Sequence, residues 1–461
     1  MHIIHINKND VRGGAARFAN LLHHGLRKLE ISSTLLVDIK LSNSGDVVLL
    51  ENDNNRSAWF RIFNKLAIQI GQSTFKGSWL LFKTMRFISS PVRWSYKYLG
   101  IDYYNFPGLK SKIKPLLQPG SIFQIYVAHG EYLDLRYVQE LSEKHIVILR
   151  MPDAWLLSGH CAHSFDCERW KTGCGNCPDL SIPPSINRDA TRYNWKFKSG
   201  LFDKSKFHIV TPSHWLMNKV KQSMLMKGAV DLSVIPNGVD TDIFSVGVQL
   251  DSRQILGIDP GATVLLFSAN GIKKNRWKDY AQLQEVFKQL VEVKFEKQVE
   301  FIGLGDGGED EMKGSIRIRY VKYQQDTNVL VHYYRSADLY IHPTKADSFP
   351  NSILEALSCG VPVIANGVGG IPEQVKSFSN EKISDSGSWA KHSKEHATGV
   401  LIPPGDSKSF FTAVKCLIEN TQLRIQLGRN ARNDAYLRFS QQRVTADYLK
   451  LYNQLSKREV I

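Results

Sequence analysis

Two carboxylates in the second half of the chain, Asp347 and Glu355, stand on either side of a seven-residue stretch. An apolar run ending at His342 precedes them, and the helix-forming run that contains Glu355 stops at Gly360. One carboxylate therefore lies on the loop after a strand and the other about one turn into a helix, near the carboxyl edge of a parallel sheet, where ligands bind. Carboxylates there can accept hydrogen bonds from ribose or sugar hydroxyls. The alternative is a helix N-cap at Asp347 and a surface position for Glu355.

Pro350 and Asn351 mark the start of this helix. Proline is favoured in the first helical turn, where its missing N–H costs nothing. The free backbone N–H groups of that turn point the same way as the loop carboxylate. These residues predict a site for a polar ligand at the helix N-terminus.

A glycine pair near the start of the chain, Gly13-Gly14, follows an apolar run at residues 3–6 and precedes a stretch of good helix propensity. A strand, glycines and a helix N-terminus together form a place where backbone N–H groups can meet a phosphate. A plain tight turn is the alternative. We expect either a phosphate contact or a simple turn at this position.

Four cysteines crowd into residues 159–178, and they are Cys161, Cys167, Cys174 and Cys177. The closing Cys-x2-Cys pair, beside glycines and a proline, has the spacing and turn residues of a tetrahedral zinc site. Free thiols, another kind of cluster, or disulfides are the alternatives. Reducing conditions in the cytoplasm, where we expect this chain, argue against disulfides.

The whole chain has 461 residues, about three times a typical domain of ~150 residues, so two domains are expected. Apolar residues make up 43% and charged residues 22%, a balance that fits a globular protein and excludes wholesale disorder. The net charge of +15 predicts an anionic partner: nucleic acid, phosphorylated ligands or an acidic membrane surface. The N-terminus lacks the features of a signal peptide, and no apolar stretch is long enough for a spanning helix.

Short apolar runs alternate with amphipathic segments along both halves of the chain, which predicts two parallel, helix-flanked sheets. Expected strands of the first half lie at residues 3–6, 33–37, 121–126, 146–149, 208–211 and 232–235. Those of the second half lie at 264–268, 300–302, 316–321, 339–342, 363–366 and 400–402. A polar, turn-rich stretch at 237–256 predicts a domain boundary near residue 245.

The segment between Arg56 and Tyr98 contains eight basic residues and no acidic one, interleaved with aromatic residues. Basic plus aromatic is the composition of an interfacial anchor, so we expect association with an anionic membrane surface. The alternatives are a domain core with a solvated basic face, or a single-stranded nucleic-acid site. No stacking-module signature supports nucleic acid.

The run from Ala346 to Ala365 resembles the acidic motif of glycosyltransferase family 4, whose members are retaining enzymes with the GT-B fold. Further matches are Gly13-Gly14 and the segments 210–216, 235–240, 303–307 and 369–373. The resemblance implies two Rossmann-like domains facing each other across a cleft. We expect an acceptor domain at 1–245, a donor domain at 246–435, and a terminal helix at 436–461 that packs back on the first domain.

By this resemblance, Glu355 would hold the ribose of a nucleotide sugar and Asp347 would contact the donor sugar hydroxyls. The family usually has glutamate at the first position, so Asp347 is one methylene shorter. Arg276 and Lys278 would neutralise the diphosphate leaving group. The nucleotide site would also include Gly13, Gly14, Gly305, Phe349, Pro350 and Asn351.

The segment corresponding to Pro152-Asp153 usually carries histidine before the aspartate in relatives. Here Pro152 stands in its place. The resemblance therefore nominates Asp153 as a residue that contacts substrate, with His129 as a neighbouring group that could take over. A structural turn is the alternative role for Asp153.

The implied reaction is transfer of a glycosyl group from a nucleotide sugar to a saccharide acceptor with retention of configuration. We expect a lipid-linked acceptor, peripheral association with the cytoplasmic membrane, and a role in O-antigen, capsule or exopolysaccharide synthesis. No cofactor or divalent metal is expected for the chemistry. The rival functions are a nucleotide-sugar epimerase and a non-catalytic sugar- or nucleotide-binding partner of a polysaccharide synthase.

Overall fold

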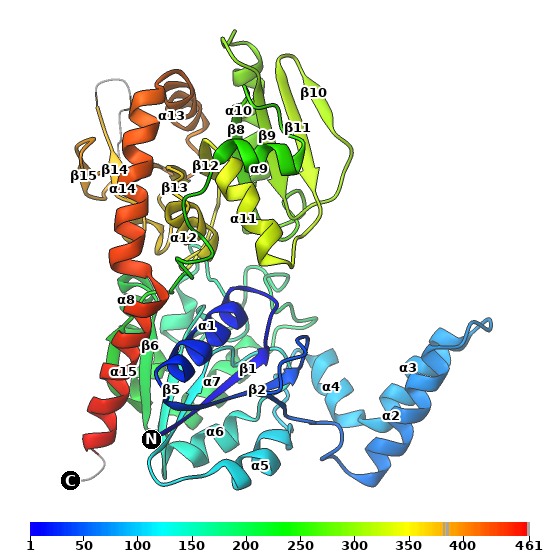
Figure 1. Ribbon diagram of the computed structural model, residues 1–461. Coiled ribbons are helices and arrows are strands. Elements are labelled where there is room, and N and C mark those ends of the chain that lie inside the picture. Colours follow the sequence, from blue (N-terminus) through cyan, green and yellow to red (C-terminus); the bar gives the residue numbers. More distant parts are fainter. Residues whose placement is uncertain (381–382, 384–386, 459–461) are drawn as a thin grey trace. The chain divides into compact units, whose positions relative to one another are not determined.

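The computed structural model describes residues 1–380, 383 and 387–458, which form two compact units. Unit 1 comprises residues 1–211, 216–235 and the chain from Tyr448, and unit 2 comprises 212–215 and 236–447 (Figure 1). The boundary lies about ten residues before the expected position near 245. The reason is that Val239 pairs through its backbone with Phe439 and Gln441, both in unit 2.

Unit 1 is built on a seven-stranded sheet in the order β3-β2-β1-β4-β5-β6-β7, with every pair parallel. The strands are β1 (His2–Asn9), β2 (Ser32–Ile39), β3 (Val47–Leu49), β4 (Ser121–Ile125), β5 (Ile146–Arg150), β6 (Phe207–Thr211) and β7 (Ala229–Val234). All residues of β4 and β5 are buried, as expected for a parallel sheet covered on both faces.

The helices around this sheet are α1 (Gly14–Lys28), α5 (Gly108–Ile113), α6 (Leu135–Ser142), α7 (Thr191–Phe202) and α8 (His214–Lys221). Single 3-10 turns lie at η1 (Lys114–Leu116), η2 (Trp155–Leu157), η3 (Arg169–Lys171) and η4 (Met224–Gly228). The last helix, α15 (Gln441–Arg458), ends on unit 1, where the Tyr452 hydroxyl donates to the Gln124 side chain at 2.7 Å.

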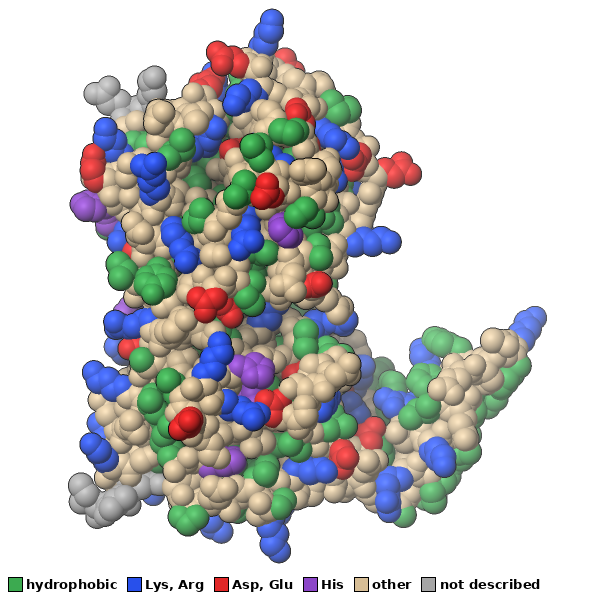
Figure 2. All heavy atoms as spheres, in the orientation of Figure 1, with side chains coloured by type: hydrophobic (Ala, Val, Ile, Leu, Met, Phe, Trp, Pro, Cys, Tyr) green, Lys and Arg blue, Asp and Glu red, His purple; other side chains and the backbone are tan. Residues whose placement is uncertain are grey.

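Three consecutive helices form a projection from unit 1: α2 (Ala58–Gly71), α3 (Ser78–Ser89) and α4 (Pro91–Leu99). Figure 1 shows α2 and α3 as an antiparallel pair that extends away from the sheet of unit 1; we call this pair the arm. The Ser57 hydroxyl caps α2 by accepting from the Phe60 amide. Hydrophobic and basic side chains run along the arm in Figure 2.

Unit 2 is built on a nine-stranded sheet within the described residues, in the order β10-β11-β9-β8-β12-β13-β16-β14-β15. Its strands are β8 (Thr263–Ser268), β9 (Val299–Leu304), β10 (Glu311–Lys313), β11 (Ile316–Val321), β12 (Leu339–His342), β13 (Val363–Asn366), β14 (Ser377–Phe378), β15 (Lys391–His392) and β16 (Gly399–Ile402). The β10–β11 pair is antiparallel, and the other described pairs are parallel.

Helices α9 (Gln249–Leu256), α10 (Tyr280–Val291), α11 (Thr327–Ser336), α12 (Asn351–Ser358), α13 (Ser407–Glu419) and α14 (Thr421–Phe439), with the turn η5 (Ile371–Glu373), complete unit 2. Alternate residues of β8 enter two separate cores: Val264 and Leu266 join one, while Leu265 and Phe267 join the other. Each face of the sheet therefore has its own hydrophobic layer.

The predicted architecture of two parallel, helix-flanked sheets is confirmed. In each sheet the chain order reverses beside one strand: β1 lies between β2 and β4, and β8 lies between β9 and β12. Such switch points open a crevice at the carboxyl ends of the strands, where ligands of open parallel sheets bind. In the part of the chain that the structure describes, none of the helices is long and apolar enough to cross a membrane.

Candidate active site

The candidate active site of unit 2 lies at its switch point, on the loops that follow β8 and β12. The loop after β8 is held against the loop after β12 by backbone pairing. Asp279 donates its amide to the Pro343 carbonyl at 3.0 Å, and Lys345 donates to the Trp277 carbonyl at 2.9 Å. Lys278, between the two contacts, is thereby fixed opposite Thr344.

Lys278 meets two side chains from the β12 end of the sheet. Its ammonium donates to the Asp347 carboxylate at 2.8 Å and lies 3.2 Å from Nε2 of His342. The Lys278 side chain is 10% exposed, Asp347 24% and His342 fully buried. The cluster therefore consists of a cation and a carboxylate that are partly accessible, Lys278 and Asp347, and a fully buried imidazole, His342, that contacts Lys278.

The surroundings set the charges in this cluster. Burial, and then the nearby Lys278 charge, lower the pKa of His342 to about 4, so its imidazole is neutral near pH 7. Because an ammonium group only donates, Nε2 of His342 accepts, and the ring proton lies on Nδ1, 3.3 Å from the Tyr340 hydroxyl. Burial opposes ionisation of Asp347, but the Lys278 charge outweighs it and holds the pKa of that carboxyl below its usual range.

Glu355 lies one turn into α12 and is 6% exposed, which excludes the surface position considered as an alternative. The Tyr334 hydroxyl of α11 donates to Glu355 Oε2 at 2.6 Å. Burial, and then the neighbouring Glu355 charge, raise the pKa of Tyr334 well above 10, so this hydroxyl stays a donor. The contact fixes one carboxylate oxygen of Glu355.

The loop that carries Asp347 is shaped by close backbone packing at two glycines. Gly369 has φ +59°, and a Cβ there would lie 1.8 Å from the Asp347 carbonyl oxygen. A Cβ on Gly370 would lie 2.1 Å from the Ser348 carbonyl oxygen. Any larger residue at either position would displace the loop, so both glycines position Asp347.

The start of α12 is anchored by an amide outside the predicted set. Asn237 donates to the Phe349 carbonyl at 3.0 Å and to Oδ1 of Asn351 at 2.7 Å. The Phe349 side chain is buried and packs on Phe439 at 6.0 Å between ring centroids. Phe349 therefore supports the loop from the core, and its ring does not line the site. Pro350 is the N-cap of α12.

Gly305 and Arg276 occupy the remaining predicted positions of unit 2. Gly305 has φ +122°, and a Cβ there would lie 1.8 Å from the Ala269 carbonyl oxygen, so this glycine lets the loops after β8 and β9 touch. Arg276 is exposed, two residues before Lys278. Sequence reasoning missed His342 and Tyr334, and only the position of His342 at the end of an apolar strand is a signal that could have identified it.

In unit 1 the predicted residues lie on loops at the carboxyl ends of its strands. Gly13 has φ +90° and is the N-cap of α1, whose first turn has no acidic residue. Nε2 of His129, after β4, lies 3.0 Å from Asp153 Oδ2, after β5. The other oxygen of Asp153 accepts the Trp155 amide at 2.9 Å. The structure thus brings His129, from another loop, beside Asp153.

The cysteines of the predicted zinc site lie on one loop of unit 1. The four loop cysteines form no disulfide, and among the described residues no three of their thiols lie within reach of one metal ion. The thiols instead contact different parts of the loop: Cys174 Sγ accepts the Gly159 amide at 3.2 Å, and Cys177 Sγ lies 3.4 Å from Nε2 of His160. Burial raises the pKa of Cys174 to about 12. A structural zinc site at Cys161, Cys167, Cys174 and Cys177 therefore stays a prediction.

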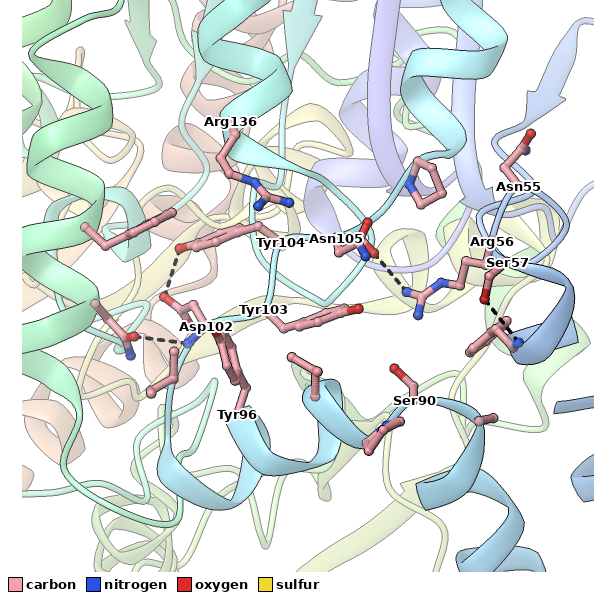
Figure 3. A pocket seen from close by; sticks show the side chains of 18 of the residues that line it. Asn55, Arg56, Ser57, Ser90, Tyr96, Asp102, Tyr103, Tyr104, Asn105 and Arg136 are labelled. Atoms are coloured by element: carbon pink, nitrogen blue, oxygen red, sulfur yellow. Dashed lines mark hydrogen bonds between the residues drawn. The ribbon is translucent and has the colours of Figure 1, made fainter. Parts of the chain in front are cut away.

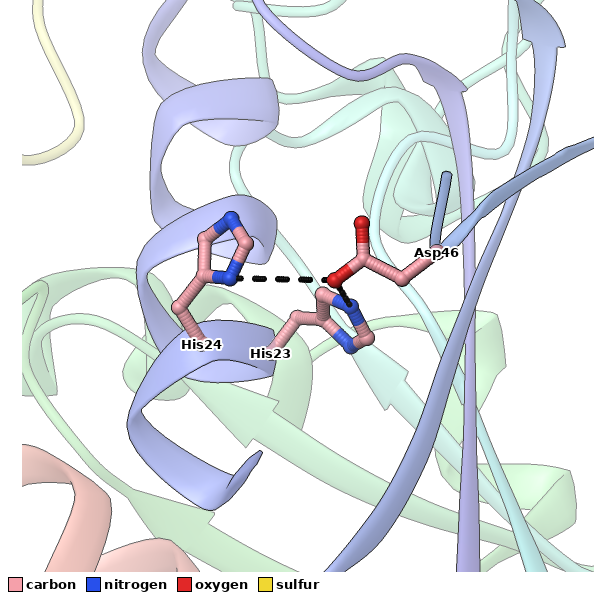
Figure 4. A group of neighbouring side chains, drawn as sticks. All are labelled: His23, His24 and Asp46. Carbon is pink, nitrogen blue, oxygen red and sulfur yellow. Dashed lines mark hydrogen bonds and ion pairs between the residues drawn. The ribbon is translucent and has the colours of Figure 1, made fainter. Parts of the chain in front are cut away.

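One group in the described part of the chain has the spacing of a metal site: His23, His24 and Asp46 of unit 1 (Figure 4). Asp46 Oδ2 lies 3.3 Å from His23 and 4.0 Å from His24. The Arg27 guanidinium donates to the same oxygen. A cation would have to displace this guanidinium, so the arrangement is that of an ion-pair cluster.

Sequence comparison matches residues 262–420 to the family described as glycosyl transferases group 1. The chain is 23% identical over 280 residues to the putative colanic acid biosynthesis glycosyl transferase WcaC of Escherichia coli, covering 57% of this chain and 64% of that protein. It is 23% identical over 252 residues to N-acetyl-alpha-D-glucosaminyl L-malate synthase of Bacillus anthracis, covering 53% and 58%. The chain thus spans about six tenths of the length of these curated relatives.

Solved structures match over nearly the whole chain. Sucrose-phosphate synthase from Thermosynechococcus elongatus has a TM-score of 0.60 at 15% identity and covers 98% of both chains. Anabaena HepE in complex with UDP and glucose has a TM-score of 0.58 at 15% identity, covering 98% of this chain and 99% of the other. With the two parallel-sheet units, these matches show that the chain has the GT-B fold, and residues 262–420 are similar to the glycosyl transferases of group 1.

Proposed function

We propose that this protein is a retaining glycosyltransferase of family 4 that moves a sugar from a nucleotide sugar to a saccharide acceptor. The observation that carries the proposal is the Lys278–Asp347 pair, 2.8 Å apart at the switch point of the group 1 domain. A fixed cation at this edge of a parallel sheet suits a diphosphate. Asp347 and Glu355 supply acceptors for the hydroxyls on either side of it.

In this proposal the side chains divide the donor between them. Glu355, fixed by Tyr334 through one oxygen, accepts hydrogen bonds from the ribose hydroxyls. Asp347 accepts from hydroxyls of the transferred sugar, while Lys278 and the exposed Arg276 neutralise the diphosphate. Gly13 and Gly14, at the N-terminus of α1, favour negative charge through the helix dipole.

The proposed reaction breaks the bond between the anomeric carbon and the diphosphate oxygen and forms a bond from that carbon to the acceptor oxygen on the same face. The acceptor hydroxyl proton passes to the departing diphosphate, so no strong general base is required. Lys278 stabilises the negative charge that develops on the leaving group. In unit 1, the His129–Asp153 pair provides polar groups for sugar hydroxyls.

The acceptor and the biological role are inferred from the relatives and from the surface. HepE was solved with UDP and with UDP-glucose, which makes uridine nucleotides the first donors to test. WcaC is named for colanic acid biosynthesis. We infer by analogy that this chain acts in bacterial surface-polysaccharide synthesis, such as O-antigen, capsule or exopolysaccharide, on a lipid-linked saccharide.

The arm of unit 1 supports work at a membrane. It exposes large apolar side chains, among them Trp79 at 65% and Leu80 at 64%. The segment from Arg56 to Tyr98, which contains the arm, carries eight basic residues and no carboxylate. An exposed apolar surface flanked only by cations is complementary to anionic lipid, so we infer that the arm docks on the cytoplasmic face of the membrane.

The donor site is tested by calorimetric titration of UDP, GDP, ADP and their sugars into wild type, Glu355→Ala and Lys278→Ala. Lys288→Ala is the matched control, because Lys288 is an exposed cation on α10. We expect one nucleotide to bind, both site variants to weaken it, and the control to bind as wild type does. Absence of nucleotide binding by the folded protein would overturn the assignment of both residues.

Turnover separates the proposal from its rivals. A labelled nucleotide sugar should yield a labelled acceptor product, whereas an epimerase would change the donor without acceptor, and a non-catalytic partner would change neither. Membrane docking is tested by sedimentation with phosphatidylglycerol and phosphatidylcholine vesicles. Trp79→Ser with Leu80→Ser should abolish binding to the anionic vesicles, and Leu437→Ser, an exposed apolar residue of unit 2, should not.

A further inference from the structure

Unit 1 contains a pocket at the base of the arm, with a cavity volume of about 710 Å³. Its wall includes the first turn of α2, the junction between α3 and α4, and the loop at residues 101–107, together with side chains from α6 and α7. None of the residues proposed above for the donor site belongs to it. Figure 3 shows Arg56 and Tyr103 extending toward one another across this space.

Arg56 is a buried cation whose hydrogen-bonding capacity is not filled. Its side chain is 6% exposed. One nitrogen donates to the Asn105 carbonyl at 3.1 Å, and Nε has no hydrogen-bond partner among the described residues. The nearest carboxylate, Asp53, is more than half exposed and lies 3.8 Å away. A desolvated guanidinium with a vacant donor favours an anionic ligand, because it gains a charge-assisted hydrogen bond on binding.

The other charged groups of the pocket already have partners. Arg136 forms a two-point contact with Asp134, at 2.9 and 2.7 Å. Asp102 accepts the Tyr104 hydroxyl at 3.1 Å and lies 3.7 Å from the ammonium of Lys198. Arg56 is therefore the lining cation without a carboxylate at hydrogen-bond distance, because its nearest one, the solvent-exposed Asp53, lies 3.8 Å away. Burial lowers the pKa of Arg56, in keeping with a cation held away from water.

The remaining lining is aromatic and hydroxyl-bearing. Tyr104 stacks on Phe197 with ring centroids 5.1 Å apart and planes 9° from parallel, and Tyr193 continues the stack at 6.5 Å. Tyr96 and Tyr103 contribute further rings and hydroxyls. Flat apolar faces edged by hydroxyls match a sugar, which has an apolar face and a rim of polar groups.

We propose that this pocket binds a phosphorylated sugar, with its phosphate on Arg56 and its ring on the tyrosine-lined wall. Phe60 of α2 and Pro91 of α4 line the pocket, so it opens where the arm joins the body of unit 1. A lipid attached to the phosphate could then follow the exposed apolar surface of the arm. Only the identification of this ligand as the head of the lipid-linked acceptor rests on the proposed function.

The test uses the full chain and calorimetric titration with N-acetylglucosamine 1-phosphate, N-acetylglucosamine and inorganic phosphate. We expect the sugar phosphate to bind more tightly than either single component. Arg56→Gln should weaken its binding roughly tenfold to a hundredfold, the range for a lost hydrogen bond to a charged group. Arg61→Gln, which removes an exposed cation of α2 that does not line the pocket, should have no effect.

A second variant guards against misfolding of Arg56→Gln. Asn105→Asp changes an exposed residue of the pocket lining and adds a negative charge to the pocket, which should repel the phosphate and weaken binding by a similar factor. Equal affinity of wild type and both variants for the sugar phosphate would overturn the inference. So would binding of phosphatidylglycerol vesicles through Arg56 without any binding of the sugar phosphate, since the site would then be one for a phospholipid headgroup.

UDP binding measured in the same samples distinguishes this inference from the proposed function. UDP binding by a protein that ignores the sugar phosphate overturns the pocket assignment and leaves the donor site in place. Sugar-phosphate binding that depends on Arg56, without binding of any nucleotide, supports the pocket and overturns the donor-site proposal.

Discussion

Lys278 of unit 2 and Arg56 of unit 1 are both nearly buried cations, yet their surroundings differ. Lys278 has a carboxylate at 2.8 Å and a neutral imidazole at 3.2 Å. Arg56 has a carbonyl at 3.1 Å, a vacant Nε and its nearest carboxylate at 3.8 Å. The first charge is balanced before any ligand arrives, whereas the second is balanced poorly within the protein.

This difference has consequences for how each site would work. A balanced cation costs little stability and is held in one place, which suits a group that must meet charge developing in a transition state. A poorly balanced buried cation raises the free energy of the ligand-free protein, so binding of an anion is favoured. We therefore expect Lys278 to act mainly on the transition state of the reaction, and Arg56 to act mainly in binding an anionic ligand.

The largest effect is expected from Lys278→Ala. Loss of one preorganised donor to a developing oxyanion typically lowers turnover by about 10²- to 10³-fold, and we expect that loss in kcat/KM. Steady-state kinetics with the donor identified by calorimetry measures it. Lys288→Ala should retain wild-type turnover, and a Lys278→Ala enzyme within about threefold of wild type would contradict the assigned role.

The second effect is on the pH dependence of the free energy of unfolding, and it tests the role of His342 beside Lys278 and Asp347. The pKa of His342 is about 4 in the folded protein and about 6.5 when unfolded, so between these values the unfolded chain binds the extra proton. Above pH 6.5 this proton uptake does not affect the free energy of unfolding. As the pH falls from 6.5 toward 4, proton uptake by the unfolded chain lowers the free energy of unfolding by about 3 kcal/mol. Urea unfolding of wild type and His342→Gln at pH 7 and pH 4.5 measures the difference.

Because other histidines also titrate in this range, the informative quantity is the change in slope between the two proteins. We expect His342→Gln to lose less stability than wild type on acidification. The same loss in both proteins would show that His342 is not held neutral by its surroundings, and would weaken the description of Lys278 as a balanced cation.

A third effect, smaller still, is expected from Glu355→Gln. The amide oxygen can still accept from Tyr334, so the fold should be kept, but the charge that holds the ribose hydroxyls is lost. We expect KM for the donor to rise about tenfold with a smaller change in kcat, because the interaction is made equally in ground and transition states. A fall in kcat alone would instead place Glu355 at the reacting bond.

The sequence also predicted the two sites to different extents. The spacing of Asp347 and Glu355 around a strand-to-helix junction was enough to predict a ligand site at a sheet edge. The meeting of Lys278 with His342 was not predictable, because 64 positions separate them and only the parallel pairing of β8 and β12 brings their loops together. Sheet order, unlike spacing within one loop, depends on long-range packing.

The unit 1 pocket was beyond sequence reasoning for a further reason. Its lining comes from segments spread between Asn55 and Phe197, and none of these segments has a motif. The basic and aromatic composition around Arg56 was visible, but composition does not show which cation is buried. Likewise, short strands such as β3, β10 and β14 are too brief for periodicity to reveal.

The smallest effect expected is on the stability of the ligand-free protein when each cation is replaced by methionine. Lys278→Met should be destabilising, because it leaves Asp347 without its closest partner. Arg56→Met should be neutral or stabilising by about 1 kcal/mol. The reason is that a buried charge with an unpaired donor is removed and an apolar side chain packs on Phe60 and Phe106. Thermal and urea unfolding without ligand measure both. The sign of the Arg56→Met change shows whether Arg56 is poorly balanced within the protein. Marked destabilisation would mean that the carbonyl of Asn105 and the surrounding rings already satisfy this guanidinium. Arg56 and Lys278 would then not differ in how well the protein balances their charges.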